Sequence, residues 1–234
     1  MTMKLKNYAM ALMVGTGMMG VSAPAQAADL EIGADIGVYS EYVWRGTAYS
    51  AGAPAVQGDF ATSFNDNLSA NVWFSNVIGG VNGPSTEFDY TLDYSGEVGD
   101  IGYSVGAIAY RFLNASPDNS LEVYAGVSMD MLSATLYYDT DLYKKDMYLE
   151  VSAEMELAGF LTSATIGYVI PNVGTSEVSV ITLTAGKDFE MGDVTVSPSF
   201  AYNIASGPNA AVTNAAGYVT SGGDKMVAGV NFAY

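Results

Sequence analysis

Hydrophobic and polar residues alternate along most of this chain. The clearest run is Thr86–Ser95, where Phe88, Tyr90, Leu92 and Tyr94 are separated by acidic or hydroxylated residues. Because successive side chains of a β-strand point to opposite sides, alternation with a period of two predicts strands with one apolar and one polar face. No segment after residue 27 has 18 consecutive apolar residues or a sustained helical period. The pattern therefore predicts an all-β protein.

Twelve segments carry this alternation and are predicted to be strands. In the first of them the even-numbered positions are mostly apolar and the odd-numbered positions are mostly Gly, Asp or Glu, so the two faces differ sharply. The twelve segments are Leu30–Trp44, Ala55–Phe64, Leu68–Ile78, Thr86–Ser95, Ile101–Phe112, Leu121–Met129, Leu132–Tyr138, Met147–Glu156, Phe160–Ile170, Ser179–Phe189, Val194–Asn203 and Lys225–Tyr234.

The connections between these segments alternate between short and long. The short ones are Asn65–Asn67, Gly96–Asp100, Asp130–Met131, Leu157–Gly159 and Glu190–Asp193. The longer ones are rich in turn-forming residues, and they are Arg45–Pro54, Gly79–Ser85, Leu113–Ser120, Asp139–Asp146, Pro171–Val178 and Ile204–Asp224. Short turns at one rim and long loops at the other are typical of outer-membrane β-barrels. We therefore predict a 12-stranded antiparallel transmembrane β-barrel of the outer-membrane type, with both termini on the periplasmic side.

Residues 1–27 have the pattern of a secretory signal peptide. Two lysines precede an apolar stretch, Ala9–Val21, and small residues of the kind that signal peptidase accepts follow it. The apolar stretch is too short to span a bilayer as a helix. We expect cleavage between Ala27 and Ala28, which makes residues 28–234 the barrel domain.

A soluble β-sandwich would show the same alternation, because one face of each of its sheets packs on a core. Two observations favour a barrel in outer-membrane lipid instead. Gly229, Phe232 and Tyr234 resemble the C-terminal signal by which the bacterial barrel-assembly machinery recognises its clients. The polar faces also carry many carboxylates, and unpaired charges are prohibitively costly in a dry core. Those faces are therefore expected to be wet.

The composition removes most enzyme classes from consideration. The chain contains no His and no Cys, so it cannot form a Ser-His-Asp triad, a thiol nucleophile, a usual zinc site or a disulfide. The net charge of -17 argues against nucleic acid as a partner, because a phosphate backbone needs clustered Lys and Arg. Asp139–Glu150 imitates a calcium-binding loop, but Lys144 stands where its glycine belongs. We expect no enzymatic activity, no metal and no cofactor.

The charged residues on the predicted polar faces are candidates for the lining of a water-filled lumen. They are Glu31, Asp35, Glu41, Arg45, Asp59, Glu87, Asp89, Asp93, Arg111, Glu122, Glu150 and Glu154. Rings of Asp and Glu attract cations and repel anions, and a narrow passage of low dielectric strengthens this effect. The acids therefore predict a preference for cations or neutral solutes. Two other roles stay open, since some acids could pair with the few bases or bind divalent cations at the loop rim.

Arg45 and Arg111 are the only arginines of the chain, and both are predicted on the polar side of their strands. A guanidinium among carboxylates forms two-pronged ion pairs. Such an arginine either narrows the lumen and filters anionic groups, or braces the barrel wall in a structural ion pair. The two roles do not exclude each other.

One block of residues resembles a known family. Glu41-Tyr42-Val43-Trp44-Arg45-Gly46 is followed by Ser50, by Pro54-Ala55-Val56-Gln57-Gly58, by Trp73 with Ser75-Asn76-Val77, and by Glu87-Phe88-Asp89-Tyr90. This block resembles the TorF family of proteobacterial porins over about residues 29–96. The resemblance implies an outer-membrane barrel with a signal peptide and a porin role, and it implies no particular substrate.

These observations predict a narrow channel for passive diffusion of small solutes across the bacterial outer membrane. An alternative is a plugged barrel that acts as a surface adhesin or receptor through its extracellular loops, above all Ile204–Asp224. That loop is also suited to fold into the lumen. A third alternative, an acid/base hydrolase in the lumen, predicts that substitution of Glu87 or Asp89 abolishes an activity. The sequence predicts neither the solute nor the oligomeric state.

Overall fold

The computed structural model describes residues 31–77, 85–113, 119–142, 145–205 and 223–234, with only the backbone of Glu31. The regular elements of this part of the chain are β-strands: β1 (Glu31–Tyr39), β2 (Val43–Trp44), β3 (Thr47–Ala48), β4 (Ala55–Ser63), β5 (Leu68–Val77), β6 (Ser85–Val98), β7 (Ile101–Phe112), β8 (Ser120–Met129), β9 (Leu132–Asp139), β10 (Met147–Leu157), β11 (Phe160–Ile170), β12 (Glu177–Gly186), β13 (Phe189–Met191), β14 (Val194–Ala205) and β15 (Lys225–Ala233). Among these residues there is no helix long and apolar enough to cross a membrane.

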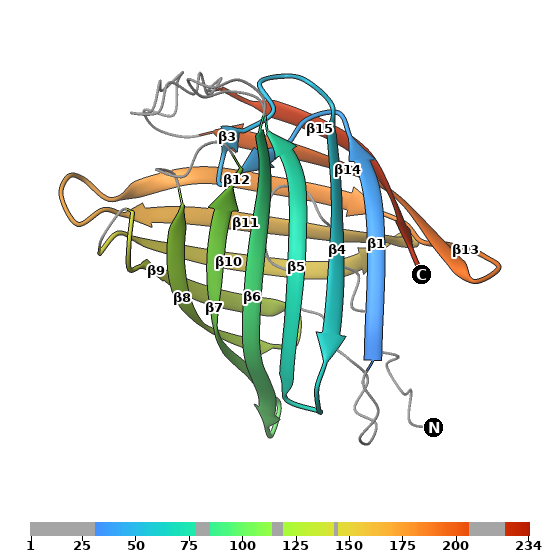
Figure 1. The fold of residues 1–234 in the computed structure, drawn as a ribbon, viewed down its shortest axis with the longest axis horizontal. Helices are drawn as coiled ribbons and strands as arrows, with labels where there is room; N and C mark the ends of the chain where they lie inside the picture. Colours follow the sequence, from blue (N-terminus) through green and yellow to red (C-terminus); the bar gives the residue numbers. More distant parts are fainter. Residues whose placement is uncertain (1–30, 78–84, 114–118, 143–144, 206–222) are drawn as a thin grey trace.

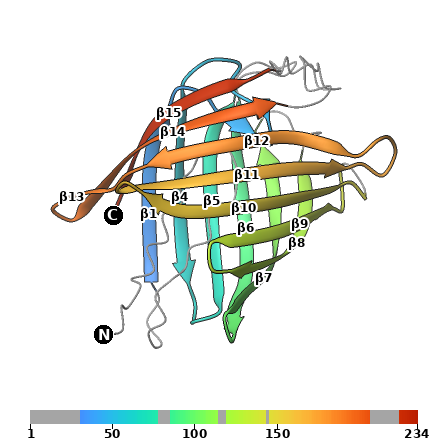
Figure 2. The same cartoon turned by 180° about the vertical axis from the view of Figure 1, so that it is seen from behind.

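The long strands close into one antiparallel barrel. From β4 to β12 each strand pairs with the next, β1 pairs with both β4 and β15, and the pairing of β12 with β14 completes the ring. The short strand β13 pairs only with the start of β14, which leaves 12 strands in the wall. In Figure 1, β4, β5 and β6 form the near wall and β10, β11 and β12 cross behind them, and Figure 2 shows the barrel from the other side. Closure pairs backbone groups that find no water in a bilayer.

The predicted strands and turns are confirmed with two exceptions. The strand predicted over Ser179–Phe189 ends at Gly186, and Phe189–Met191 forms the separate strand β13, which takes up part of the predicted turn Glu190–Asp193. The short connections join the strands at one end of the barrel, here called the turn end, and the longer connections leave from the other end, here called the loop end. The other exception is the strand predicted over Leu30–Trp44, which ends at Tyr39. Val43–Trp44 pairs with Thr47–Ala48 in a separate hairpin. The chain bends after Tyr39 although the alternation continues, so the period alone does not reveal the bend.

The outer surface of the wall is apolar. Alternate positions of the long strands expose large hydrophobic side chains, for example Ile36, Val105 and Ile166, which expose 51%, 50% and 47% of their surface. Exposure of such a continuous apolar surface to water is unfavourable, whereas the hydrocarbon of a bilayer solvates it. The apolar faces therefore form a band suited to lipid, as the alternation predicts.

The buried core lies inside the barrel toward the loop end. One cluster contains Tyr39, Tyr42, Val43, Ala48, Ala55, Trp73, Val77, Ala201 and Val227. A second contains Ile108, Tyr110, Tyr124, Tyr137 and Tyr148. Trp44 and Phe112 pack against both clusters and so connect them. Aromatic side chains thus occupy much of the interior of the barrel near the loop end.

Inward-facing glycines make room for the tyrosine rings. Gly106 of β7 is paired with Tyr124 of β8, and a Cβ on Gly106 would overlap the phenol of Tyr124. The ring therefore lies across β7, and its hydroxyl donates a hydrogen bond to Asp93 of β6. Tyr148 lies over Gly167 in the same way. Glycine at these positions is needed for the packing of the tyrosines.

We expect Gly106→Ala to lower the free energy of unfolding by about 1–3 kcal/mol, because the added methyl group displaces the Tyr124 ring and its hydrogen bond. Gly33→Ala is the matched control, since a Cβ on the inward-facing Gly33 meets no atom within 4 Å. Urea unfolding of the protein in lipid vesicles, followed by tryptophan fluorescence, measures both variants. Equal midpoints for the two variants would contradict this role of Gly106.

Candidate functional site

The connection from β1 to β4 folds into the barrel, where Tyr42 and Val43 join the core. It contains the hairpin β2–β3, whose turn is Arg45-Gly46. Both turn residues have positive φ, 49° for Arg45 and 82° for Gly46, as a type I′ turn requires. Glycine adopts this conformation freely, but an arginine does so at an energetic cost. The contacts of the Arg45 side chain must offset that cost.

Hydrogen bonds within the connection fix the stem of the hairpin. The amide of Tyr42 donates to Ser50 Oγ (2.8 Å), and the amide of Tyr49 donates to the carbonyl of Tyr42 (2.8 Å). The carboxylate of Glu41 accepts a hydrogen bond from the amide of Gly52 (2.7 Å). The stem is therefore held at its base, independently of the tip.

The tip of the hairpin contacts strands that lie far from β1 in the ring. On one side, a Cβ on Gly46 would lie 3.1 Å from the Cβ of Val180 in β12. On the other side, Arg45 forms a two-pronged ion pair with Glu122 of β8, in which Nη1 lies 2.7 Å from Oε1 and Nη2 lies 2.8 Å from Oε2. Since β8 and β12 belong to different parts of the wall, the hairpin crosses the lumen and contacts both.

Three aromatic rings surround the guanidinium of Arg45. Its Cζ lies 4.4 Å from the ring centroid of Trp44, 4.8 Å from that of Tyr137 and 4.1 Å from that of Tyr148. Cation–π contacts of this kind are strongest where water is excluded. The ion pair and the rings together hold Arg45 in its turn conformation.

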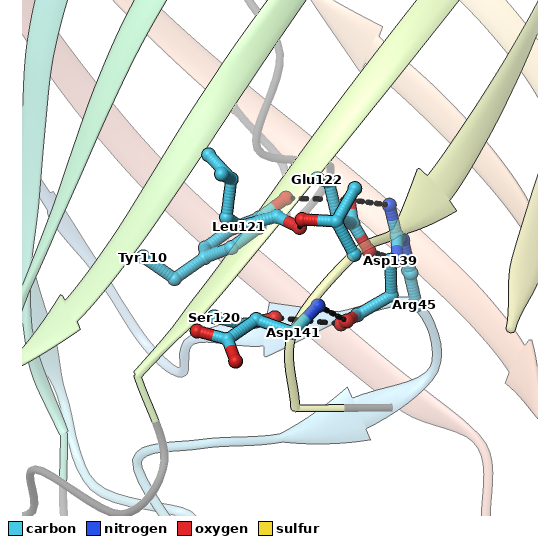
Figure 3. Close-up of polar contacts among 8 residues, drawn as sticks. Arg45, Tyr110, Ser120, Leu121, Glu122, Asp139 and Asp141 are labelled. Carbon is cyan, nitrogen blue, oxygen red and sulfur yellow. Dashed lines mark hydrogen bonds and ion pairs between the residues drawn. The ribbon is translucent and has the colours of Figure 1, made fainter. Parts of the chain in front are cut away.

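Glu122 is positioned by neighbours as well as by Arg45 (Figure 3). Tyr110 donates a hydrogen bond to Glu122 Oε2 (2.9 Å). At the loop end of the same strand, Ser120 Oγ donates to Asp139 Oδ2 (2.6 Å), and this ties β8 to β9. Residues of the barrel wall therefore fix the position of the Glu122 carboxylate that binds the guanidinium of Arg45.

The surroundings keep Arg45 charged. Burial lowers the pKa of its guanidinium, but the Glu122 carboxylate and the neighbouring tyrosines raise it by more, so that the pKa lies above its ordinary value. The contact with Glu122 is thus the ion pair of a charged guanidinium. Of the two roles expected for Arg45, the structural ion pair is present. Because Arg45 lies at the tip of a hairpin that crosses the lumen, its position also suits the second role, a residue that narrows the lumen.

Most of the predicted lumen acids occupy inward-facing positions of the strands. These are Asp35, Asp59, Glu87, Asp89, Asp93, Glu122, Glu150 and Glu154. Asp35 and Asp59 stand directly opposite each other on β1 and β4, and Asn71 donates a hydrogen bond to Asp59 (2.6 Å). In the described ranges no three acidic residues are grouped so that they could hold a metal ion. The acids are spread along the barrel rather than gathered in one centre.

Arg111 is placed differently from the prediction. Its neighbours Tyr110 and Phe112 pack inside the barrel, so Arg111 lies on the outer face of β7, where it is exposed. Its Nη1 donates to the backbone carbonyls of Tyr110 (2.7 Å) and Ser120 (2.9 Å). The prediction that Arg111 lines the lumen is wrong, because the inward positions of β7 are taken by Ile108 and the aromatic residues.

Two further residues are predicted to line the lumen. Glu41 is buried inside the barrel, as expected, but it belongs to the stem of the hairpin rather than to a strand of the wall. The side chain of Glu31 lies outside the described residues.

The alternation does not reveal the inward hairpin or the rings around Arg45. The glycine of Arg45-Gly46 is suited to a two-residue turn, but Arg is not a usual first residue of such a turn, and the dipeptide follows a run that has the pattern of a strand. The inward position of Tyr137 could be read from β9, where the neighbouring Leu136 and Tyr138 are exposed. The same parity places Asp139 inside, although Asp139–Asp146 is predicted to be a loop.

The predicted assembly signal lies in β15 and directly after it. Gly229 faces the ring of Tyr39, which would overlap a Cβ at that position. Phe232 and Tyr234 are exposed. Recognition of these residues by the assembly machinery stays a prediction.

The chain belongs to a bacterial family described as "Bacterial protein of unknown function (Gcw_chp)", which matches residues 23–234. The match does not confirm the name of the TorF family. No match was found among the curated proteins.

Solved structures share the fold at low sequence identity. The KdgM porin is 14% identical, with a TM-score of 0.51 over 86% of this chain and 99% of the porin. The COG4313 outer membrane channel from Pseudomonas putida F1 is 11% identical, with a TM-score of 0.49 over 92% and 98% of the two chains. LpxR from Salmonella typhimurium is 8% identical, with a TM-score of 0.46 over 86% and 99%. The likeness to the KdgM porin supports the barrel fold and nothing beyond the fold.

We expect Arg45→Met to lower the free energy of unfolding by about 3–5 kcal/mol, because Glu122 is then buried without its partner. Combining it with Glu122→Leu is expected to restore part of this loss, since the double variant leaves no unpaired charge. Urea unfolding in lipid vesicles of wild type, both single variants and the double variant gives the coupling energy.

Arg111→Met is the matched control for Arg45→Met, because Arg111 lies on the outer face and contacts only backbone carbonyls. Its expected effect stays within about 0.5 kcal/mol. Strictly additive effects of the substitutions at Arg45 and Glu122 would contradict a coupled pair.

Proposed function

We propose that this member of the Gcw_chp family forms a porin-like channel in the bacterial outer membrane, through which small solutes diffuse passively and cations or neutral solutes are favoured over anions. The observation that carries the proposal is a closed barrel with an apolar outside and an inside that carries carboxylates and hydroxyls. Lipid solvates the first surface and water the second. The proposal includes no enzymatic activity, since the chain has no His or Cys from which the common nucleophilic centres are built.

Small polar side chains occupy the inner face toward the turn end. Examples are Ser104, Ser128, Ser133, Ser152, Ser163 and Thr184. Some of them form hydrogen bonds across neighbouring strands, as Ser152 does with Thr165 (2.8 Å). Such side chains fill less of the cross-section than the aromatic residues near the loop end, and they offer donors and acceptors to neutral solutes.

The distribution of charge supports a preference for cations. Asp93 and Glu154 lie toward the turn end, and Asp35 and Asp59 lie farther along the barrel. The charge of Arg45 is neutralised by Glu122. A cation that passes through the barrel therefore meets carboxylates at several depths, whereas an anion meets repulsion.

The β2–β3 hairpin supports a narrow passage. It crosses the lumen near the loop end and contacts β8 and β12. Solutes have to pass beside it, so the hairpin limits their size. The Arg45–Glu122 ion pair holds the hairpin in this position.

The same hairpin favours a second candidate, a plugged barrel that acts as a surface receptor or adhesin. Its residues and the wall form aromatic clusters that fill much of the interior near the loop end. The loop Ile204–Asp224, which is the candidate for this role, lies almost entirely outside the described residues. Solute flux through the purified protein separates the two candidates.

Export and assembly complete the proposal. Residues 1–27, which lie outside the described residues, act as a signal peptide that is cleaved between Ala27 and Ala28. The barrel-assembly machinery then recognises the C-terminal strand through Gly229, Phe232 and Tyr234. The support for this route is the sequence pattern given above.

A planar bilayer under a KCl gradient tests the channel. We expect the refolded protein to give a reversal potential of the sign that indicates preference for K⁺, because the inward charges are predominantly carboxylates. A reversal potential of the opposite sign would contradict the cation preference. A folded barrel that passes no current would favour the receptor candidate.

Conductance also tests the hairpin as the size-limiting element. In the variant Arg45→Ser/Gly46→Cys/Val180→Cys the ion pair is absent, and a disulfide ties the tip to β12 only under oxidising conditions. The chain has no other cysteine, and the Cβ positions of residues 46 and 180 are close enough for a disulfide after a small adjustment. We expect higher conductance in the reduced than in the oxidised state, because the untied tip leaves the lumen.

The control is Arg45→Ser alone, whose conductance should not respond to the reductant. Equal conductance of the triple variant in its two redox states would show that the hairpin does not limit the passage.

A further inference from the structure

Two buried carboxylates lie beneath the hairpin without a basic partner. Glu87 and Asp89 project from the inner face of β6, and they expose only 3% and 4% of their surface. Tyr42 of the hairpin stem donates a hydrogen bond to Glu87. Glu87 Oε2 and Asp89 Oδ1 are buried and accept no hydrogen bond from the described residues. Within the same part of the chain, no Lys or Arg forms an ion pair with either carboxylate.

The groups around these carboxylates are aromatic or already paired. Trp73 of β5 and Tyr110 of β7 stand directly opposite Asp89 in the sheet. The charged groups that act on Asp89 from other elements are Glu122 of β8 and Arg45 of the hairpin. Both nitrogens of the Arg45 fork are bound to Glu122. The Arg45–Glu122 pair carries no net charge, so it leaves the two further acids without a compensating positive charge.

Adjacent carboxylates that are buried and unpaired are strongly unfavourable, because each has lost its water and each repels the other. The charge of Arg45, in the same part of the interior, is stabilised by an ionic partner and by several aromatic rings. Glu87 and Asp89 each offer a free acceptor oxygen to the same interior. What these two carboxylates lack is a positively charged partner.

We propose that Glu87 and Asp89 form a binding site for one monovalent inorganic cation, held between Glu87 Oε2 and Asp89 Oδ1 beneath the hairpin. The site is a single binding position for a cation inside the barrel. The inference rests on the proposed function only for the route by which the ion reaches this position. Because Tyr42 is hydrogen-bonded to Glu87, an ion at this site also stabilises the hairpin in the lumen.

The available ligands favour a monovalent over a divalent ion. Ca²⁺ takes about six to eight oxygen ligands, and Mg²⁺ requires a nearly ideal octahedron. The described residues contain no group of three acids placed to hold a metal ion. A singly charged ion at these two carboxylates binds weakly enough to leave again, as conduction requires.

Thermal unfolding of the whole refolded barrel in detergent micelles tests the site directly. KCl is raised while N-methyl-D-glucamine chloride is lowered, so that ionic strength and chloride stay constant. A ligand that binds only the folded state raises the unfolding temperature until the site is saturated. We expect such a saturating rise with K⁺, and no larger rise with CaCl₂ at equal ionic strength.

Glu87→Gln and Asp89→Asn, singly and together, keep the size of the side chains and remove their charge. We expect the double variant to lose the dependence on K⁺ and to unfold at a higher temperature than wild type when K⁺ is absent. Glu154→Gln is the matched control, because Glu154 is an inward-facing but exposed acid of β10. Its dependence on K⁺ should equal that of wild type.

A wild-type unfolding temperature that does not change with K⁺ at constant ionic strength would overturn the proposal, even if no variant folds. The same holds if the double variant responds to K⁺ as wild type does, or if Ca²⁺ stabilises wild type more than K⁺. Conductance separates this proposal from the channel itself. A cation-selective channel without K⁺-dependent stability overturns only the site, whereas K⁺-dependent stability in a barrel that passes no current overturns only the channel.

Discussion

Closure of the backbone hydrogen bonds into a ring is the constraint on which the rest of this structure depends. An unpaired N–H or C=O group finds no water inside a bilayer, so a sheet can cross it only without free edges. The pairing of β12 with β14 removes the last edge of the wall. In a closed ring, alternate positions face lipid and lumen. Charged side chains are therefore restricted to the inner positions, where Glu87 and Glu122 stand, or to the rims, where Arg111 stands.

Most of the wall could be predicted because one physical signal, the period of two, operates in every strand. The prediction fails where that signal continues through a bend. Trp44 has the same parity as Ile36 and Val38, yet it belongs to the hairpin. Hydrophobicity cannot separate the two cases, since an aromatic side chain is equally suited to lipid and to the core of a filled lumen. Arg111 shows the opposite case, a charged residue on the outer face. A long charged side chain near a rim can reach water from that face.

The candidate site could be predicted only in part for a related reason. Parity places Glu87, Asp89 and Glu122 inside, but the choice of Glu122 as the partner of Arg45 depends on where the hairpin tip comes to lie. The block of residues that resembles a porin family coincides with the hairpin and the wall beneath it. Tyr42 from that block packs against Trp73, with 5.3 Å between the ring centroids. The block thus corresponds to a contact in space, which a linear pattern does not show.

The hairpin residues lie near the start of the barrel sequence, whereas the residues that they contact lie much later in the chain. Glu122 lies 77 residues after Arg45, and Tyr148 and Val180 lie farther still. Contacts between such distant segments form slowly, because the entropy of closing a long loop is lost before they are made. During folding the first strands therefore carry an unseated hairpin, with its aromatic residues and its strained arginine, until β8, β10 and β12 are in place. The hairpin can make these contacts only once those strands are in place, so a seated hairpin marks a wall that is built at least as far as β12.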